Sequence, residues 1–253
     1  MSITSVERAL LILKEIAYSE TGVGVREIAR RLGISPSVAQ KSVAALVAQG
    51  FARQNPETEL YQIGPAAIQV GLAGLLRIEL RGVARPYLQQ LMSDTGESSF
   101  LGVLQGNGAV YIDKVLSPTE LRMDAPLGSW RPLNCTAVGK VLLAFLPESS
   151  LEQLAKGGAF QQSTPNSICD VHALAKEMAS VRQSGVAYDR EEYLQGAMCL
   201  AAPVKNHEGD VVASVVVSGP LSRIEPRLQE MVRHVKRQGD AISRSLGFIG
   251  VNL

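Results

Sequence analysis

The residues best suited to contact another molecule lie between positions 26 and 53. They carry basic or short polar side chains, which can pair with DNA phosphates and with the edges of base pairs in the major groove. Gln40 and Lys41 are the strongest candidates for groove contacts, and Arg53 is a candidate for a phosphate contact. The full set of predicted DNA-binding residues is Arg26, Ser35, Ser37, Gln40, Lys41 and Arg53.

Two short helices joined by a tight turn are expected to position these side chains. Apolar residues recur at helical spacing from Val25 to Leu32, and Gly33 is suited to end the first helix. Ser35 is suited to cap the second helix, which has Pro36 in its first turn. On the second helix we expect an inward face and an outward face, formed respectively by Val38, Ser42, Ala45 and Leu46 and by Ser37, Gln40, Lys41 and Ala44.

The flanking segments complete a recognisable unit. An amphipathic helix over residues 5–18, with Ser5 as its cap, is expected to pack behind the two helices. Residues 51–53 and 60–63 are predicted to form a hairpin around a turn at 55–58. This order predicts a winged helix-turn-helix, whose second helix enters the major groove. The alternative is an ordinary packing unit of three helices with a hairpin.

The composition is typical of a folded protein. The chain has 253 residues, of which 46% are hydrophobic, and a formal net charge of +1. This charge gives no overall attraction to nucleic acid, so any DNA affinity must come from the local placement of basic residues. No apolar stretch approaches the length that spans a bilayer, and the N-terminus carries no secretion signal. We therefore expect a cytoplasmic protein.

Residues 65–78 are predicted to form a linker helix with almost no charge, whose large apolar residues are Ile68, Leu72, Leu75 and Leu76. A helix that is apolar on all sides must be buried, either against its twin in a second chain or within its own chain. The first interpretation predicts a homodimer or homotetramer. It would allow two recognition helices to reach half-sites separated by one turn of DNA, roughly 34 Å.

The pattern after the linker predicts an α+β domain that resembles a GAF or PAS-like sensor, with helices flanking an antiparallel sheet. The expected helices cover residues 78–93, 134–146, 149–156, 170–184 and 223–246, and the expected strands cover 99–104, 109–115, 121–125, 186–189, 198–205 and 211–218. The predicted domains are therefore a DNA-binding domain at 1–64, the linker at 65–78 and a sensor domain at 79–253.

Several kinds of chemistry are not expected. Gly139-Lys140 lacks the earlier glycines and the following Ser or Thr of a phosphate-binding loop. The histidines and cysteines have no metal-ligand spacing, so no metal or cofactor is expected. The cysteines are odd in number and fit reduced thiols rather than a disulfide framework: Cys135, Cys169 and Cys199.

With these elements assembled, the chain resembles the isocitrate lyase regulator (IclR) family of bacterial transcription regulators over nearly its whole length. In the first domain and the linker, the resemblance rests on SVERALLILKEIA, VREIARRLGISPSVAQKSVAALVAQGF and YQIGPAAIQVG. In the second domain it rests on YIDKV, RPLNCTAVGKVLLAFLP, GVAYDREEYLQGAMCLAAPV and VVVSGP. The resemblance implies a winged helix-turn-helix, a dimerising linker helix and a C-terminal domain that binds a small-molecule effector.

Two positions depart from the family pattern. The family often has Thr-Val-His-Arg on the recognition helix where this chain has Val38-Ala39-Gln40-Lys41, so the operator sequence cannot be transferred. The family histidine before the TAxGK helix is Asn134 in this chain. This substitution leaves the polar groups of the effector site open.

Small acids are the usual effectors in proteins that resemble this one, and the sequence offers a physical reason. The N–H groups of Ala137 and Val138 stand at the start of a helix, where they lack intrahelical acceptors and can hold a carboxylate. By resemblance, Asp189, Cys199 and Ser218 supply polar contacts. The walls implied by the same resemblance are Met123, Leu133 and Ala197, with Trp130 as an added aromatic surface.

Each of these residues also has a purely structural interpretation. Asp189 can cap backbone at a strand end, and together with Glu191 and Glu192 it forms an acidic cluster that we interpret as structural. Cys199 and the predicted wall residues can be plain core, and Trp130 can be a surface packing residue. Two other functions remain open: an enzyme with Cys199 as its nucleophile, and a sensor that binds protein instead of DNA.

Overall fold

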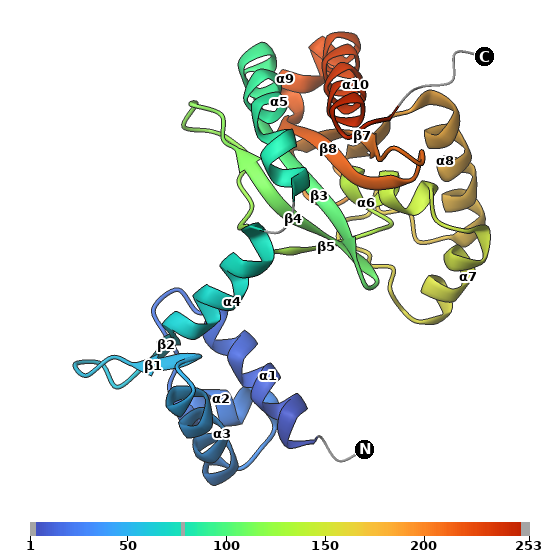
Figure 1. Cartoon of the computed structure of the whole chain (residues 1–253). Coiled ribbons are helices and arrows are strands. Elements are labelled where there is room, and N and C mark those ends of the chain that lie inside the picture. Colours follow the sequence, from blue (N-terminus) through green and yellow to red (C-terminus); the bar gives the residue numbers. More distant parts are fainter. Residues whose placement is uncertain (1–3, 77–78, 249–253) are drawn as a thin grey trace. The chain divides into compact units, whose positions relative to one another are not determined.

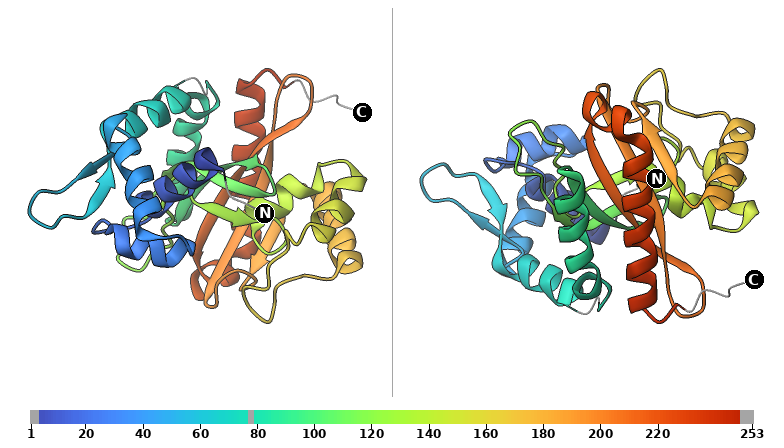
Figure 2. Two further views of the ribbon diagram at one scale, coloured as in Figure 1. Left: turned by 90° about the horizontal axis from the view of Figure 1, so that it is seen from below. Right: turned by 90° about the horizontal axis from the view of Figure 1, so that it is seen from above.

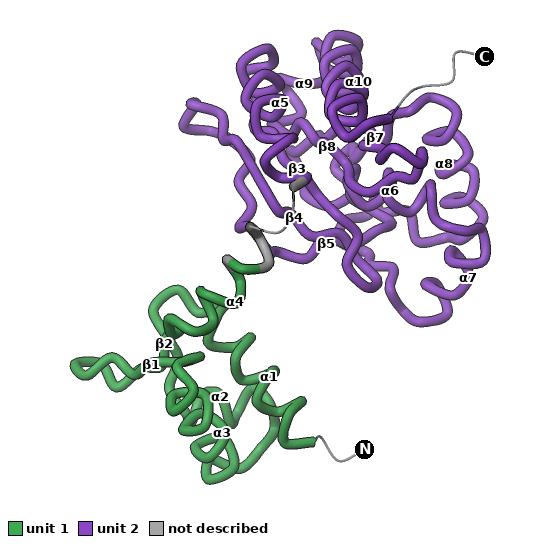
Figure 3. Tube along the Cα trace, in the orientation of Figure 1, with its two compact units in different colours: residues 1–78 green, residues 79–253 purple. Residues whose placement is uncertain are grey.

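The computed structural model describes residues 4–76 and 79–248. The chain divides into two compact units, residues 1–78 (unit 1) and residues 79–253 (unit 2) (Figure 3). The predicted linker, 65–78, includes residues 77–78, which lie outside the described residues, as do the side chains of Leu72, Leu75 and Leu76.

Unit 1 contains the predicted order of helices and strands (Figure 1). Its elements are α1 (Ser5–Ala17), α2 (Val25–Leu32), α3 (Pro36–Ala48), β1 (Ala52–Gln54), β2 (Tyr61–Ile63) and α4 (Pro65–Leu76). Strands β1 and β2 pair antiparallel, which forms the wing of the winged helix-turn-helix. The three helices enclose a small core that includes Ile12, Ile16, Ile28, Ala39, Val43 and Leu46.

Local signals in the sequence explain where these helices begin and end. Helix α1 is capped by Thr4 and not by Ser5 as expected, because Thr4 and Glu7 cap each other's backbone N–H groups reciprocally. Helix α2 ends at Gly33, which adopts a left-handed conformation with φ of 63°. The Ser35 hydroxyl accepts the N–H of Val38 at the start of α3.

The predicted inward face of α3 is partly wrong. Leu46 is buried as expected, but Val38 and Ser42 are only half-buried and Ala45 is exposed. The buried positions are Ala39, Val43 and Leu46, which follow the spacing of four and three residues that lines one helix face. The predicted outward residues, Ser37, Gln40, Lys41 and Ala44, are all exposed.

Unit 2 is built on a six-stranded antiparallel sheet with the strand order β5-β4-β3-β8-β7-β6. Its strands are β3 (Ser98–Gln105), β4 (Gly108–Val115), β5 (Trp130–Pro132), β6 (Ala187–Arg190), β7 (Ala197–Lys205) and β8 (Val211–Pro220). Strands β3 and β8 are paired at the centre although more than a hundred residues separate them in sequence. This long-range pairing joins the two halves of the domain around one core.

Helices cover both faces of this sheet (Figures 1 and 2). Helices α5 (Glu79–Thr95) and α10 (Leu228–Ser245) pack together on one face, and α6 (Ala137–Ala144) packs on the other. Helix α8 (Val171–Ser184) lies against α6, and α7 (Glu148–Lys156) lies against α8. All eight residues of α6 are buried, so this helix lies at the centre of the domain.

Two predicted elements of unit 2 need correction. The strand expected at 121–125 is wrong, because the partner edge of β4 is occupied by β5, with Gly108 opposite Pro132. The single helix expected at 223–246 is divided into α9 (Leu221–Ile224), a 3-10 turn (Glu225–Arg227) and α10. Pro226 accounts for the division, since it has no N–H to donate within a continuous helix.

Candidate DNA-binding surface and effector cavity

The exposed face of α3 carries the predicted groove-reading residues. Ser37, Gln40 and Lys41 are exposed, with Ser35 at the helix start. The hydroxyls of Ser35 and Ser37 lie 3.1 Å apart, so they form one polar group at the N-terminal end of α3. The N-terminal residues of a recognition helix are the ones that contact base edges in helix-turn-helix proteins.

Some of the basic residues around α3 form ion pairs within unit 1, and others have exposed side chains. Arg26 on α2 and Arg53 on β1 are exposed. Arg30 and Arg31 both pair with Glu27, each at 2.7 Å, so part of their charge is neutralised within α2. The two guanidinium groups lower the pKa of Glu27 to about 2. Arg26, Lys41 and Arg53 therefore remain better placed for phosphate than Arg30 and Arg31.

A cavity of about 90 Å³ lies in unit 2, between the sheet and the start of α6. Of the nine residues predicted for effector binding, six line this cavity: Met123, Ala137, Asp189, Ala197, Cys199 and Ser218. Leu133 and Val138 lie in the hydrophobic core instead. The indole of Trp130 lies against Gly108, where the absence of a side chain leaves room for the ring.

Arg131 also lines the cavity, although it is not among the site residues predicted from the sequence. Its guanidinium lies over the rings of Tyr111 and Tyr193, at 5.6 and 5.3 Å from their centres. The alternation of side chains along a strand indicates only that Trp130 and Arg131, neighbours on β5, face opposite sides, and the pairing of β5 with β4 decides which of them faces the cavity. Choosing Trp130 for the cavity therefore excluded the residue that supplies its positive charge.

The N-terminus of α6 faces the cavity through Thr136 and Ala137. Thr136 is the N-cap: its hydroxyl accepts the N–H of Gly139 and donates to the carbonyl of Pro132. The first intrahelical bond runs from the N–H of Lys140 to the carbonyl of Thr136. The N–H groups of Ala137 and Val138 precede that bond, so they stand at the positive end of the helix without intrahelical acceptors.

Asp189 provides the carboxyl group of the cavity. Its Oδ1 accepts the N–H groups of Glu192 and Tyr193, at 2.8 and 3.2 Å. Asp189 therefore caps backbone, as in the structural interpretation, and it also lines the cavity. Burial raises the pKa of Asp189 to about 7, and the backbone hydrogen bonds only partly offset this effect. Asp189 can therefore change its charge near neutral pH.

Cys199 and Ser218 face each other on neighbouring strands β7 and β8, with Sγ and Oγ 3.0 Å apart. Cys199 keeps some exposure because it borders the cavity, but protein atoms surround it closely. Burial, with a contribution from nearby Asp189, raises the pKa of the Cys199 thiol. Burial therefore disfavours the thiolate, which is the nucleophilic form of cysteine.

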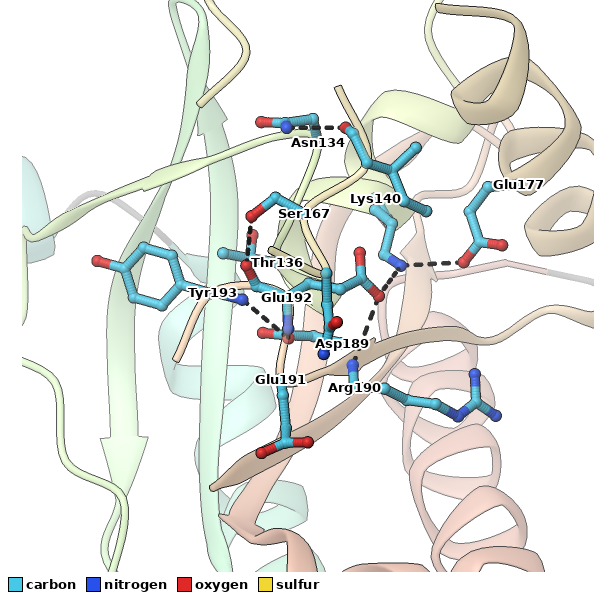
Figure 4. A network of polar contacts seen from close by, with 12 residues as sticks. Asn134, Thr136, Lys140, Ser167, Glu177, Asp189, Arg190, Glu191, Glu192 and Tyr193 are labelled. Atoms are coloured by element: carbon cyan, nitrogen blue, oxygen red, sulfur yellow. Dashed lines mark hydrogen bonds and ion pairs between the residues drawn. The ribbon is translucent and has the colours of Figure 1, made fainter. Parts of the chain in front are cut away.

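Behind the cavity, a polar network joins the segment after β6 to α6 and α8 (Figure 4). Lys140 pairs with Glu192 at 2.7 Å and with Glu177 at 3.0 Å. Asn134, at the position of the family histidine, donates to the carbonyls of Gln161 and Ile168 and accepts the N–H of Gln161. Asn134 therefore anchors the segment before α8.

Two further cavities bring fewer polar groups together. The larger, about 300 Å³, lies between α7 and α8 and has mostly apolar walls such as Leu143, Leu151 and Met178, while its polar lining residues, Glu148, Glu152, His172 and Arg182, are all exposed. Another of about 150 Å³ lies beside Lys205 and Lys236. Size alone would favour the first, but the smaller cavity near α6 brings together a cation, a carboxyl, a thiol, a hydroxyl and free backbone donors. Convergent polar groups of this kind are the usual mark of a ligand site.

Within the described residues, no three His, Cys, Asp or Glu side chains gather in a way that could hold a metal ion. Among the described helices, none has both the length and the apolar character needed to cross a membrane.

Comparisons with known proteins agree with this architecture. Residues 5–56 match the model of the IclR helix-turn-helix domain, and residues 73–244 match that of the bacterial transcriptional regulator IclR C-terminal domain. Over 247 residues the chain is 34% identical to the HTH-type transcriptional regulator XynR of Escherichia coli (strain K12). The aligned region covers 97% of this chain and 98% of that protein.

Solved structures give the same result. The crystal structure of the Thermotoga maritima IclR matches with a TM-score of 0.76 and 34% identity, covering 96% of this chain and 99% of that one. An IclR homologue from Microbacterium hydrocarbonoxydans, crystallised in complex with 4-hydroxybenzoate, shares the fold with a TM-score of 0.82 at 21% identity, covering 96% and 99% of the two chains.

A winged helix-turn-helix joined to a sensor-like α+β domain defines a class of proteins, the helix-turn-helix transcription regulators. Within that class, this chain belongs to the IclR family. The resemblance, the fold class and the functional class expected from the sequence are thereby confirmed.

Proposed function

We propose that this regulator binds operator DNA as a homodimer or homotetramer and changes its DNA affinity when a small organic acid occupies the cavity near α6. DNA contacts are assigned to the residues predicted from the sequence: Arg26, Ser35, Ser37, Gln40, Lys41 and Arg53. Since its partner is operator DNA, we place its action in the cytoplasm.

The observation that carries the proposal is the arrangement of charge around the cavity. Arg131 and the free N–H groups at the start of α6 favour a negative group, and a carboxylate can accept from both. Asp189, Cys199 and Ser218 can contact hydroxyl or carbonyl groups elsewhere on the ligand. A cavity of about 90 Å³ favours a ligand with few heavy atoms, because typical sites for drug-sized ligands begin at about 300 Å³.

Binding without turnover is the favoured role of this cavity. A cysteine nucleophile needs a thiolate or a base within reach, and burial raises the pKa of Cys199. His172 and His207 are exposed, and the half-buried His234 neighbours Asp94 on the α5–α10 face of the sheet. The named relatives are regulators, which also supports a non-enzymatic role.

The proposed oligomer uses the linker at 65–78. In the described part of α4, Ile68 and Val70 are 54% and 62% exposed, and a second chain would cover them. Effector binding must favour one arrangement of the paired chains over another, with typical coupling of about 1–3 kcal/mol, which is about 5- to 150-fold in DNA affinity.

The proposal is tested by thermal shift and calorimetry with acetate, lactate and benzoate, each compared with its amide. We expect at least one acid, and none of the uncharged amides, to bind. A gel shift with genomic promoter fragments then measures DNA affinity with and without that acid. Binding of the amides equal to that of the acids would contradict the carboxylate site, and absence of DNA binding at low salt would contradict the operator role.

A further inference from the structure

Two walls of the effector cavity come from segments far apart in the sequence. The start of α6 contributes Thr136 and Ala137, whereas residues 191–196, the loop between β6 and β7, contribute Tyr193 and Leu194. The size of the cavity therefore depends on what holds this loop against α6.

The loop has a backbone conformation that needs support. Glu191 has a φ of 58°, in the left-handed region that residues with a side chain seldom occupy. Its N–H donates to the carbonyl of Ala197, and its carboxylate accepts the N–H of Gly196 at 2.7 Å. Backbone of this kind persists only where the surroundings hold it in place.

The support on the cavity side is Asp189, which accepts the N–H groups of Glu192 and Tyr193. On the other side the side chain of Glu192 reaches Lys140 on α6, with 2.7 Å between Oε1 and Nζ (Figure 4). Lys140 lies one helical turn after Ala137, so a single buried ion pair connects the two walls.

The hydroxyls of Thr164 and Ser167 also hold the loop, by donating to the carbonyls of Glu191 and Glu192, but the ion pair is the contact that ties the loop to α6. The side chain of Lys140 is 1% exposed and that of Glu192 is 9% exposed. The second oxygen of Glu192, Oε2, is buried without a hydrogen-bond partner among the described residues. Without Lys140, the Glu192 carboxylate would be an uncompensated buried charge, so the loop would have to move to reach solvent or the carboxyl would have to take up a proton. In both cases the ionic contact between the loop and α6 is lost.

We propose that the Lys140–Glu192 ion pair sets the separation of the α6 wall and the loop wall, so that both residues act as positioning residues for effector binding. The inference rests on the proposed function, because it concerns the same cavity. Glu177 on α8, the second partner of Lys140 at 3.0 Å, is 28% exposed and can be solvated when the lysine is replaced. The separation of the walls therefore depends on Glu192 more than on Glu177.

The test measures the loop directly, by amide hydrogen exchange in the full chain without ligand. In Lys140→Met we expect the amides of Glu192 and Tyr193 to exchange at least tenfold faster, while amides in the central strand β8 keep their rates. Lys156→Met is the matched control, because Lys156 pairs with Glu152 at 3.4 Å on the exposed surface of α7. This control should change neither set of rates.

A second variant guards against loss of folding. The double variant Lys140→Met, Glu192→Gln removes both charges, so it leaves no uncompensated carboxylate. We expect it to melt within a few degrees of the wild type while its loop amides still exchange at least tenfold faster. A purely structural role would lower the melting temperature of the single variant without affecting the loop amides of the double variant.

Effector affinity gives the second measurement, with the acid among acetate, lactate and benzoate that binds the wild type. We expect the double variant to bind it at least tenfold more weakly and Lys156→Met to bind it normally. Unchanged loop exchange in the double variant would overturn the inference, as would unchanged acid affinity. If the loop exchange accelerates but the wild type binds none of the acids, the proposed function fails and the structural role of the ion pair stands.

Discussion

The guanidinium of Arg131 lies 5.3 Å from the centre of the Tyr193 ring, at the boundary between strand β5 and the loop that closes the cavity. Tyr111, on the neighbouring strand β4, places a second ring 5.6 Å from the same guanidinium. Stacking between two rings restricts the arginine, and among the described residues only Nη1 has acceptors, the carbonyl of Trp130 at 3.1 Å and the hydroxyl of Tyr193 at 3.4 Å. Its charge therefore remains available to a ligand.

Replacing Arg131 with Gln should weaken binding of a small carboxylate by about 10- to 150-fold. A hydrogen bond to a charged group contributes about 1.5–3 kcal/mol, and Gln keeps hydrogen-bonding ability without the charge. Calorimetry with the wild-type ligand measures the change. Arg190→Gln is the control, because Arg190 also stacks on a tyrosine, Tyr188 at 4.2 Å, but does not line the cavity. Equal losses in both variants would show that general charge, and not Arg131, matters.

Arg131 also marks the limit of what the sequence could predict about the site. Six of nine predicted cavity residues line the cavity, because family motifs fix their positions in order along the chain. Leu133 was expected as a wall, yet its side chain lies in the core, since a motif does not say which way a side chain points. Val138 was expected to contribute only its backbone N–H, and its side chain also lies in the core. The cavity-facing side of β5 depends on its register with β4, which no local pattern encodes.

The same limit applies to the fold. Helix boundaries set by local chemistry could be predicted to within a few residues, as with Gly33 after α2 and Gly185, with a φ of 70°, after α8. The strand at 121–125 was wrong because strands exist only with a partner, and β5 competes for the same edge of β4. Long-range pairing decides such cases, and local propensity does not.

Replacing Asp189 with Asn should change how stability depends on pH. The pKa of Asp189 rises from 3.8 in its usual environment to about 7 in the folded chain. Between these two pH values only the folded state holds this proton, so this group makes stability fall as pH rises from about 4 to about 7. Above pH 7 the Asp189 carboxyl is ionised in both the folded and the unfolded state. The loss of folding stability caused by its burial then reaches its full value, at most about 4 kcal/mol.

Asp189→Asn should therefore flatten the decline of stability between pH 4 and 7 and be more stable than the wild type at pH 8, because the amide oxygen can still accept the two N–H groups. Urea unfolding at several pH values measures this difference. Asp210→Asn, in the exposed turn between β7 and β8, is the control and should leave the pH profile unchanged. A steeper decline in Asp189→Asn would contradict the raised pKa.

Replacing Lys41 with Ala should reduce the salt dependence of operator binding by about one unit in the slope of log affinity against log salt, if Lys41 contacts phosphate. Gel shifts at several salt concentrations give this slope. Lys14→Ala removes the same charge from an exposed position in the last turn of α1 and should leave the slope unchanged. Loss of discrimination between operator and random DNA, with an unchanged slope, would instead show that Lys41 reads a base.

Replacing Gly139 with Ala should distort the start of α6, where we propose that the effector carboxylate binds. A Cβ atom at this position would lie 2.4 Å from the carbonyl oxygen of Pro132 and 2.5 Å from Cα of Leu133, which are backbone atoms that cannot easily move aside. Overpacking of this kind costs about 1–3 kcal/mol of folding stability. We expect a loss at the upper end of this range, together with weaker acid binding.

In contrast, Gly82→Ala on α5 meets open space among the described residues and should stabilise the chain by about 0.5–1 kcal/mol. Thermal unfolding of both variants tests the contrast.

Introducing a charge on the apolar surface of α4 should separate the proposed oligomer. Val70 is 62% exposed in the single chain, and a glutamate there would be buried without a partner if a second α4 covers it. We expect Val70→Glu to have a lower molecular mass by light scattering than the wild type and a weaker affinity for operator DNA, because two linked recognition helices bind more tightly than one.

Gln69→Glu is the control. It adds the same charge at the neighbouring position, which is already polar, and should leave both the molecular mass and the DNA affinity near wild type. A wild-type chain that is monomeric, or a Val70→Glu variant that keeps the wild-type mass, would show that α4 does not join the chains.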